Sequence, residues 1–155
     1  MPIEIERKYL LRNDDWRLNA NQGTDYEQGY IIGSDKASVR IRIERSTAML
    51  NIKSATLGIK RQEYEYEIPV DEAQELLSSL CAVPLVKKTR YIVIENDDKW
   101  EIDVFSGDNT GLVMAEIELQ SEDQSIELPS WCGQEVSDDP RYYNVNLVKH
   151  PYSTW

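Results

Sequence analysis

The stretch "IEIERKYLL" at positions 3–11 shows the pattern that organises the whole chain. Its odd positions 3, 5 and 9 are apolar, whereas the even positions carry Glu4, Glu6 and Lys8. A period of two is typical of a β-strand, because successive side chains of a strand point to opposite faces. One face of this strand therefore holds two carboxylates and an ammonium group. Such a face is either solvated or forms one wall of a binding site.

The same alternation recurs along the chain and predicts a mainly antiparallel β fold with about eight strands. Turn-forming stretches rich in Gly, Asn, Asp and Ser, such as "SGDNTG", separate the segments. No linker or repeat interrupts them, so a single domain over residues 1–155 is expected. The predicted strands lie near 2–11, 27–33, 37–45, 48–55, 61–69, 86–95, 99–105 and 112–121.

Two or three helices complete the prediction. In "VDEAQELLSSL" the apolar residues recur at helical spacing, and Asp71 is the expected N-cap. In "SDDPRYYNVNLVKH" the expected N-cap is Asp139, followed by Pro140 at the first helical position, where proline fits. The helices are predicted at 70–80, 137–150 and, as a short one, 14–20.

The bulk composition narrows the class of protein. The chain has 155 residues and a hydrophobic content of 41%, which suits a globular domain. Its net charge of −11 argues against nucleic-acid binding, which needs a basic surface. It lacks an apolar run long enough for a membrane span, and its start is too charged for a signal peptide. Because Cys81 and Cys132 match no metal-ligand spacing or disulfide framework, a reduced, cytoplasmic protein without a membrane partner is expected.

The charged residues on the alternating faces are sorted by sign. A solvated sheet face usually mixes the signs, so that neighbouring strands attract each other. Here basic pairs such as Arg40 and Arg42 stand on some strands, and acidic pairs such as Glu63 and Glu65 on others. Two carboxylates at positions i and i+2 lie about 6–7 Å apart and repel by roughly 2–3 kcal/mol at an effective dielectric constant near 20. Several such pairs around one space require cations, and Mg²⁺ or Mn²⁺ suits oxygen ligands.

A closed sheet would bring these faces together around one interior space. The lining residues would be Glu4, Glu6, Glu63, Glu65, Asp103, Glu116 and Glu118, with Lys8, Arg40, Arg42, Lys53, Lys88 and Arg90. This lining carries one net negative charge, which a single divalent cation would reverse. The site would then attract a polyanion only with metal bound, and its basic walls suit several phosphate groups in a row. The alternative is a sheet with solvated charged faces, in which removing these charges would leave metal and triphosphate binding unchanged.

The order of the charged motifs resembles that of the CYTH superfamily, also called triphosphate tunnel metalloenzymes. The opening Glu-x-Glu-x-Lys is followed by "VRIR", "NIKS", "RQEYEYEI", "KKTRY", "EIDVF", "AEIEL" and the closing "EVSDDPRYYNVNL". The resemblance covers essentially the whole chain. It implies an eight-stranded antiparallel β tunnel with a charged lumen and a C-terminal helix near one mouth. It also implies hydrolysis or rearrangement of triphosphate substrates with one or two Mg²⁺ or Mn²⁺ ions.

The resemblance further implies roles for individual residues. Glu4, Glu6 and Glu118 would hold a metal on the substrate, and Glu116 with Asp103 would position a second metal and the attacking water. The residues expected to bind metal are Glu4, Glu6, Glu63, Glu65, Asp103, Glu116 and Glu118. Those expected to bind phosphate are Lys8, Arg40, Arg42, Lys53, Lys88, Arg90 and Arg141, the last near one mouth. Those expected to act directly in phosphoryl transfer are Glu116, Asp103, Lys53 and Arg42.

Inorganic triphosphatase is the leading function within this resemblance, because the tight loops leave little room for an element that recognises a base. A class IV adenylate cyclase and a thiamine triphosphatase would share the metal and phosphate machinery and stay as alternatives. A non-catalytic polyphosphate- or nucleotide-binding module would need the basic walls but not the acidic set. The preferred metal and the oligomeric state stay open, although homodimers are common at this size.

Overall fold

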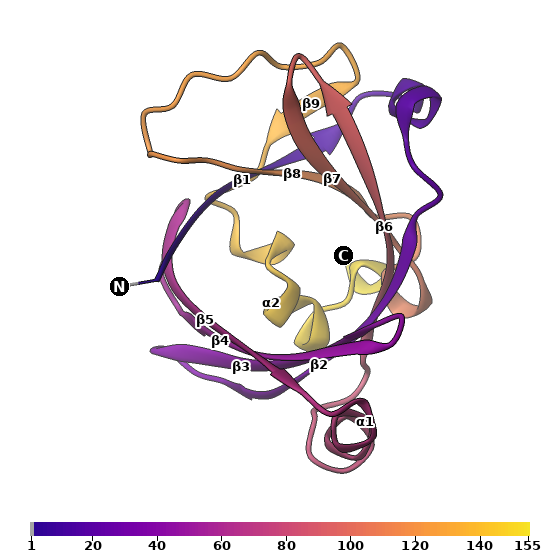
Figure 1. Cartoon of the computed structure of the whole chain (residues 1–155), viewed down its shortest axis with the longest axis vertical. Coiled ribbons are helices and arrows are strands. Elements are labelled where there is room, and N and C mark those ends of the chain that lie inside the picture. Colours follow the sequence, from indigo (N-terminus) through magenta and orange to yellow (C-terminus); the bar gives the residue numbers. More distant parts are fainter. Residues whose placement is uncertain (1) are drawn as a thin grey trace.

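The fold is a barrel of antiparallel strands, and the computed structural model describes residues 2–155 (Figure 1). The sheet order is β5-β4-β3-β2-β6-β7-β8-β1-β9, and β1 also pairs with β5, which closes the first eight strands into a barrel. The predicted eight-stranded antiparallel barrel is therefore confirmed, with one additional strand. The strands are β1 (Ile3–Leu11), β2 (Thr24–Gly33), β3 (Ala37–Glu44), β4 (Thr47–Ser54), β5 (Lys60–Ile68), β6 (Val86–Glu95), β7 (Asp98–Phe105), β8 (Val113–Glu118) and β9 (Cys132–Glu135).

The opening strand β1 closes the barrel because its two halves pair with different strands. Its first residues pair with β5, where Ile3 lies opposite Gln62 and Ile5 opposite Lys60. Residues 6–10 pair with β8, and Glu6 lies opposite Glu118. The acidic side chains of β1 are thereby placed between the charged inner faces of β5 and β8.

Two strand boundaries differ from the prediction, and one short strand was not predicted. β2 begins at Thr24 rather than near residue 27, because Thr24 still pairs with Arg90 of β6. β8 ends at Glu118 instead of extending to residue 121. β9 was not predicted, since it has only four residues and includes Gly133. A Cβ atom on Gly133 would lie 2.9 Å from a backbone oxygen of β1, so the close pairing of β9 with β1 favours glycine there.

The predicted helix at 70–80 forms as α1 (Val70–Ser79) and covers the outer face of β2, β3 and β4. Ala73 and Leu77 are buried in a cluster with residues of β3 and β4. The predicted N-cap is wrong: Pro69 has extended backbone and occupies the cap position, whereas Asp71 lies within the first turn. A proline fits here because it supplies no backbone N–H to the preceding strand or to the first turn.

The prediction of one continuous C-terminal helix at 137–150 is wrong, because the segment forms two short helices. A 3₁₀ helix (Pro140–Tyr142) is followed by the short α2 (Asn144–Lys149), and Tyr143 between them is extended, with φ −74° and ψ 131°. The capping prediction is confirmed, since the Asp139 carboxylate accepts a hydrogen bond from the backbone N–H of Arg141 at 3.1 Å. Further 3₁₀ helices lie at Asp15–Asn19, where a short helix was predicted, at Gly107–Asn109 and at Tyr152–Thr154.

The helix α2 lies inside the ring of strands in Figure 1 and fills one end of the barrel. Leu147 of α2 is fully buried in a cluster that includes Phe105 of β7 and Met114 of β8. The C-terminal helix, which was expected near a mouth, therefore closes that end, and the lumen is open at one end only. At the other end, Glu65 and Glu118 are exposed to solvent.

A second apolar core lies outside the barrel wall, over β1, β7 and β8. Trp100 packs edge-on against Tyr9 and Trp131, with ring centroids 5.7 and 5.4 Å apart, and Trp16 is also fully buried. These tryptophans are core residues, where their large aromatic side chains contribute to stability through burial. No helix within residues 2–155 combines the length and the apolar character needed to cross a membrane.

Candidate active site

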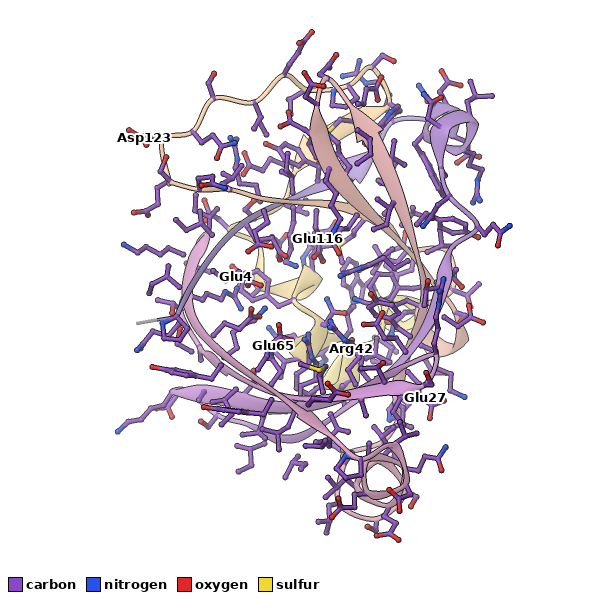
Figure 2. All side chains as sticks on the ribbon, in the orientation of Figure 1. Glu4, Glu27, Arg42, Glu65, Glu116 and Asp123 are labelled. Carbon is purple, nitrogen blue, oxygen red and sulfur yellow. The ribbon has the colours of Figure 1, made fainter. Side chains whose placement is uncertain are left out.

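The barrel interior encloses a cavity of about 240 Å³ with a lining of mostly charged side chains. In Figure 2, Arg42 and Glu65 lie within the ring of strands, whereas Glu27 lies at its outer edge. Every residue that the strand alternation assigned to the interior lines the cavity, except Asp103. The charged lining residues are Glu4, Glu6, Lys8, Arg40, Arg42, Lys53, Arg61, Glu63, Glu65, Lys88, Arg90, Lys99, Glu101, Glu116 and Glu118.

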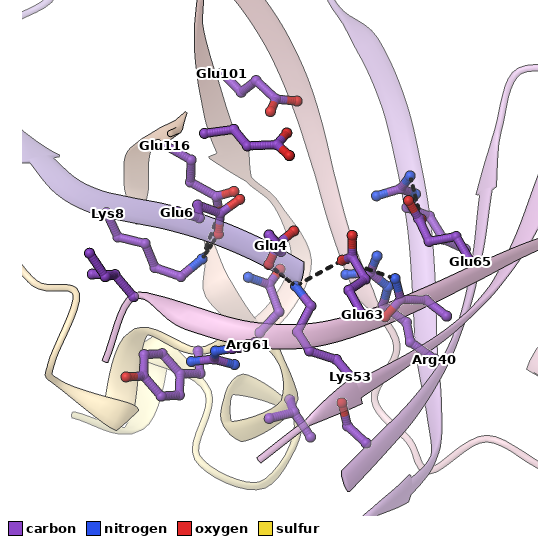
Figure 3. A pocket seen from close by; sticks show the side chains of 18 of the residues that line it. Glu4, Glu6, Lys8, Arg40, Lys53, Arg61, Glu63, Glu65, Glu101 and Glu116 are labelled. Carbon is purple, nitrogen blue, oxygen red and sulfur yellow. Dashed lines mark hydrogen bonds and ion pairs between the residues drawn. The ribbon is translucent and has the colours of Figure 1, made fainter. Parts of the chain in front are cut away.

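The first acidic group stands on β1 and β8 around Lys8. The Lys8 Nζ donates to Glu6 Oε1 at 3.0 Å and to Glu116 Oε1 at 2.9 Å (Figure 3). Burial and the neighbouring Glu116 carboxylate raise the pKa of Glu6 to about 8. Burial opposes the charged form of Lys8, but Glu116 and Glu6 raise the pKa of its ammonium above the usual value. Two close carboxylates share one ammonium group here, so an additional cation would be electrostatically favourable at this wall.

The second acidic group forms where β1 meets β5. The Lys53 Nζ lies 2.8 Å from Glu4 Oε1 and 3.3 Å from Glu63 Oε2, as the dashed lines in Figure 3 mark. Asn51 donates a hydrogen bond to Glu63 at 3.2 Å. Burial disfavours the Lys53 ammonium, yet Glu4 and Glu6 raise the pKa of Lys53. Closure of the barrel therefore places a lysine from β4 between carboxylates of β1 and β5.

Asp103 lies behind the cavity wall instead of lining it. Its side chain is fully buried, and its carboxylate accepts from Lys88 Nζ at 2.7 Å and from Arg90 Nε at 2.7 Å. Burial alone would raise the pKa of Asp103, but Arg90 and Lys88 hold it below the usual range. Burial also lowers the pKa of Lys88 to about 8, against the attraction of Asp103. Asp103 thus fixes two cations of the lining and is screened by them from the cavity.

Two guanidinium groups of β3 have spare hydrogen-bonding capacity. The buried Nε atoms of Arg40 and Arg42 have no hydrogen-bond partner among residues 2–155. Arg42 lies 3.8 Å from Glu65, whereas Arg40 makes no ion pair within the described part of the chain. Burial and the positive charges of Arg40 and Arg90 lower the pKa of Arg42. Buried donors without acceptors are costly, so this wall favours an anionic ligand.

Several lining residues escaped the sequence prediction. Arg61 shares the strand face of Glu63, and Lys99 shares that of Glu101, so the alternation that identified the others could have found them. The Arg61 guanidinium lies over the Tyr143 ring, 4.3 Å from its centroid. From the C-terminal segment, Ser137, Tyr143, Asn144 and Val145 also line the cavity, and no sequence pattern indicated them.

Arg141 is not part of the cavity. Its side chain is 62% exposed and pairs with Asp139 at 2.7 Å. The guanidinium also lies over the Trp155 ring, 5.1 Å from its centroid. Arg141 directly precedes α2, which fills one end of the barrel, but its side chain does not line the cavity.

The carboxylates of the lining fit a hard divalent cation by their chemistry. Within residues 2–155, no three Asp, Glu, His or Cys side chains already converge on one point. They stand instead in pairs that share a lysine, Glu6 with Glu116 and Glu4 with Glu63. Carboxylate oxygens are the preferred ligands of Mg²⁺ and Mn²⁺, and burial together with the neighbouring Glu116 carboxylate raises the pKa of Glu6, so a nearby cation would favour its ionised form.

The raised pKa of Glu6 predicts that the metal-free protein loses stability as the pH rises. A glutamate normally titrates near 4.5 and Glu6 near 8, so between these values the folded protein holds a proton that the unfolded chain releases. This stabilisation is complete below the lower value and is lost as the pH approaches the higher one. In chelator, the melting temperature should fall between about pH 5 and about pH 7.5. Calorimetry of wild type and Glu6→Gln checks this, since the glutamine should flatten the slope; equal slopes would contradict it.

A closed antiparallel barrel with basic and acidic walls around a lumen closed at one end defines a class of barrel protein whose interior suits a polyanion. Residues 2–151 match the family model of the CYTH domain. An inorganic triphosphatase from Acetivibrio thermocellus is 46% identical over 155 residues, covering 100% of this chain and 99% of that protein. An inorganic triphosphatase from Nitrosomonas europaea is 36% identical over 150 residues, covering 94% and 96%. The crystal structure of an inorganic triphosphatase matches with a TM-score of 0.68 at 33% identity, covering 96% and 95%.

The chain belongs to the CYTH domain family, whose triphosphatases are typically metal-dependent.

Proposed function

We propose that this protein is a divalent-metal-dependent inorganic triphosphatase that hydrolyses tripolyphosphate to pyrophosphate and phosphate. The observation that carries the proposal is the pair of guanidinium groups of Arg40 and Arg42. Their buried Nε atoms have no partner within residues 2–155, in a cavity that paired carboxylates also line. The two inorganic triphosphatases at 46% and 36% identity support it, because each matches this chain over nearly its full length.

The phosphates would be bound between two basic walls. Arg40 and Arg42 stand on β3, whereas Lys88 and Arg90 stand on β6. Arginine forms bidentate contacts with phosphate oxygens, and lysine supplies a point charge. Lys8, Lys53 and, at the closed end, Arg61 complete the proposed phosphate-binding set. Arg141 takes no part in it, because it lies outside the cavity.

The carboxylates of the lining would hold Mg²⁺ or Mn²⁺, one or two ions in number. The ligands we propose are Glu4, Glu6, Glu63, Glu65, Glu116 and Glu118. A bound ion supplies charge neutralisation on phosphate oxygens and a water of lowered pKa. For Asp103, which the sequence suggested as a metal ligand, burial behind Lys88 and Arg90 supports a different role: it positions these two cations.

In the reaction, a water oxygen bonds to a terminal phosphorus while the phosphoanhydride bond to pyrophosphate breaks. Lys8, Arg90 and Lys88 hold the pKa of Glu116 well below its usual range despite burial, so it stays an acceptor that can orient the water. Arg42 and Lys53 stabilise the charge that builds on the departing pyrophosphate. No covalent intermediate is required.

The lining favours tripolyphosphate over ATP or thiamine triphosphate. The aromatic residues of the described lining are Tyr30 and Tyr143, which belong to the end that α2 fills. A base or a thiamine ring would project through the opposite end, where Glu65, Lys99 and Glu118 stand. These charged side chains offer no stacking surface.

The decisive experiment is phosphate release from tripolyphosphate, ATP and thiamine triphosphate, each with Mg²⁺, with Mn²⁺ and with chelator. Metal-dependent turnover of tripolyphosphate well above the other two is the expected result. Formation of cyclic AMP and pyrophosphate from ATP, with no phosphate release, would instead identify an adenylate cyclase. Binding of tripolyphosphate without any turnover would identify the protein as a non-catalytic polyphosphate-binding module.

Glu6→Gln is expected to lower kcat/KM for tripolyphosphate about 10- to 100-fold, because it removes a negative charge and one proposed metal ligand. Excess Mg²⁺ should recover part of the activity. Glu67→Gln is the matched control, since Glu67 shares the strand face of Glu63 and Glu65 but does not line the cavity. Equal activity of the two variants would remove Glu6 from the proposed metal site.

A further inference from the structure

The closed end of the cavity carries a polar side chain that contacts the basic wall, Asn144, the first residue of α2. Its Oδ1 accepts a hydrogen bond from Lys88 Nζ at 3.1 Å and another from Gln28 Nε2 at 2.9 Å. Because a lysine ammonium has donors only, the carbonyl side of the amide has to face Lys88. The orientation of the Asn144 side chain is therefore fixed by its neighbours.

The contact matters because it determines where the Lys88 ammonium points. Lys88 is 3% exposed and its second acceptor is Asp103, at 2.7 Å. An ammonium group has three donors, of which Asp103 and Asn144 accept two. Since Lys88 lines the cavity, the third donor is available to a ligand there. Removing the Asn144 oxygen would free the ammonium to turn toward Asp103 alone.

Asn144 is itself held in place by the packing of α2 within the barrel. Leu147, one turn later, is fully buried against residues of β7 and β8, and Gln28 of β2 is also fully buried. We propose that Asn144 is a positioning residue for triphosphate hydrolysis, which aims the Lys88 ammonium at the substrate from the helix that closes the barrel. This inference rests on the function proposed above and adds a role for α2 beyond filling one end.

A double-mutant cycle tests the proposal with Asn144→Ala, Lys88→Met and their combination. Asn144→Ala is expected to lower kcat/KM for tripolyphosphate about tenfold, the effect of losing one hydrogen bond to a charged group. In the Lys88→Met background the same change is expected to have no further effect, because its target is gone. Asn146→Ala is the matched control: Asn146 lies on the same helix but donates to the Pro140 carbonyl at 2.8 Å, outside the cavity.

Thermal melts separate positioning from folding: Asn144→Ala leaves the buried Gln28 amide without its acceptor and is expected to melt below Asn146→Ala, so the activities are compared at a temperature at which both variants are fully folded. A full additional loss of activity in the Lys88→Met background, or an Asn144→Ala enzyme as active as Asn146→Ala, would overturn the proposal. Asn144→Ser, whose side chain is favoured at helix starts but is too short to reach Lys88, replaces the alanine variant if that one does not fold. If the wild type does not hydrolyse tripolyphosphate, the proposed function fails, and the same cycle on tripolyphosphate binding by calorimetry still decides whether Asn144 acts through Lys88.

Discussion

Asp103→Asn is expected to lower the free energy of unfolding by about 3–5 kcal/mol, the usual effect of removing one partner from a buried ion pair. Asp103 is 0% exposed and lies 2.7 Å from both Lys88 Nζ and Arg90 Nε. The asparagine keeps the shape of the side chain but leaves the Lys88 ammonium without its carboxylate partner and Arg90 with only Glu101 and Glu116. For a chain of this length, the melting temperature should fall by roughly 10 °C, which calorimetry or a thermal scan by circular dichroism would measure.

The matched control is Glu27→Gln, which changes a carboxylate on the outer side of β2. Glu27 pairs with Lys87 at 3.7 Å, and both side chains are about half exposed. Exposed pairs of this kind contribute less than about 1 kcal/mol, so the control should melt close to the wild type. Similar melting temperatures for Asp103→Asn and Glu27→Gln would show that Asp103 does not hold the buried cations in place.

Arg40→Ala is expected to reduce kcat/KM for tripolyphosphate about 10²- to 10³-fold, comparable to removing a preorganised donor from an active site. The free energy of unfolding, in contrast, should stay the same or increase. Arg40 is 9% exposed and its Nε has no partner within residues 2–155, so burial of this guanidinium opposes folding in the absence of an anion. The expected result is an enzyme that is nearly inactive but unfolds at the same or a higher urea concentration.

Arg45→Ala is the control for this prediction, because Arg45 follows the same strand but is exposed and donates to Thr24 at 3.0 Å. Its activity should stay close to that of the wild type. Loss of both activity and stability in Arg40→Ala would mean that the arginine supports the fold and not the ligand. Calorimetric titration with tripolyphosphate in chelator would add a direct measure of the lost anion binding.

Much of the site could be predicted from the alternation of charged and apolar residues. The reason is geometric: in a closed barrel, the parity of a residue decides whether its side chain points inward. Parity does not give depth along the barrel, however. Glu101 and Asp103 share the inner face of β7, but Glu101 lies opposite Glu116 in the cavity, whereas Asp103 lies opposite Met114, which packs with α2. The sequence alone therefore could not distinguish the residues that line the cavity from the residues that hold the lining in place.

The C-terminal segment was the least predictable part, because its conformation depends on the barrel that it enters. Tyr143 interrupts the expected helix, and its hydroxyl donates to the Ser137 carbonyl at 2.7 Å while its ring contacts the Arg61 guanidinium. These contacts join parts of the chain that are far apart in sequence. Local propensity alone favours one continuous helix there, and tertiary contacts override it.

The closed end of the barrel also sets the route of molecules through the protein. With α2 filling one end, we expect substrate to enter and both products to leave by the same opening. Pyrophosphate would then have to leave the lumen before the next triphosphate binds, so both products would be released in every turnover. We therefore do not expect a phosphate chain to pass through the barrel from one end to the other, because α2 lies in that path.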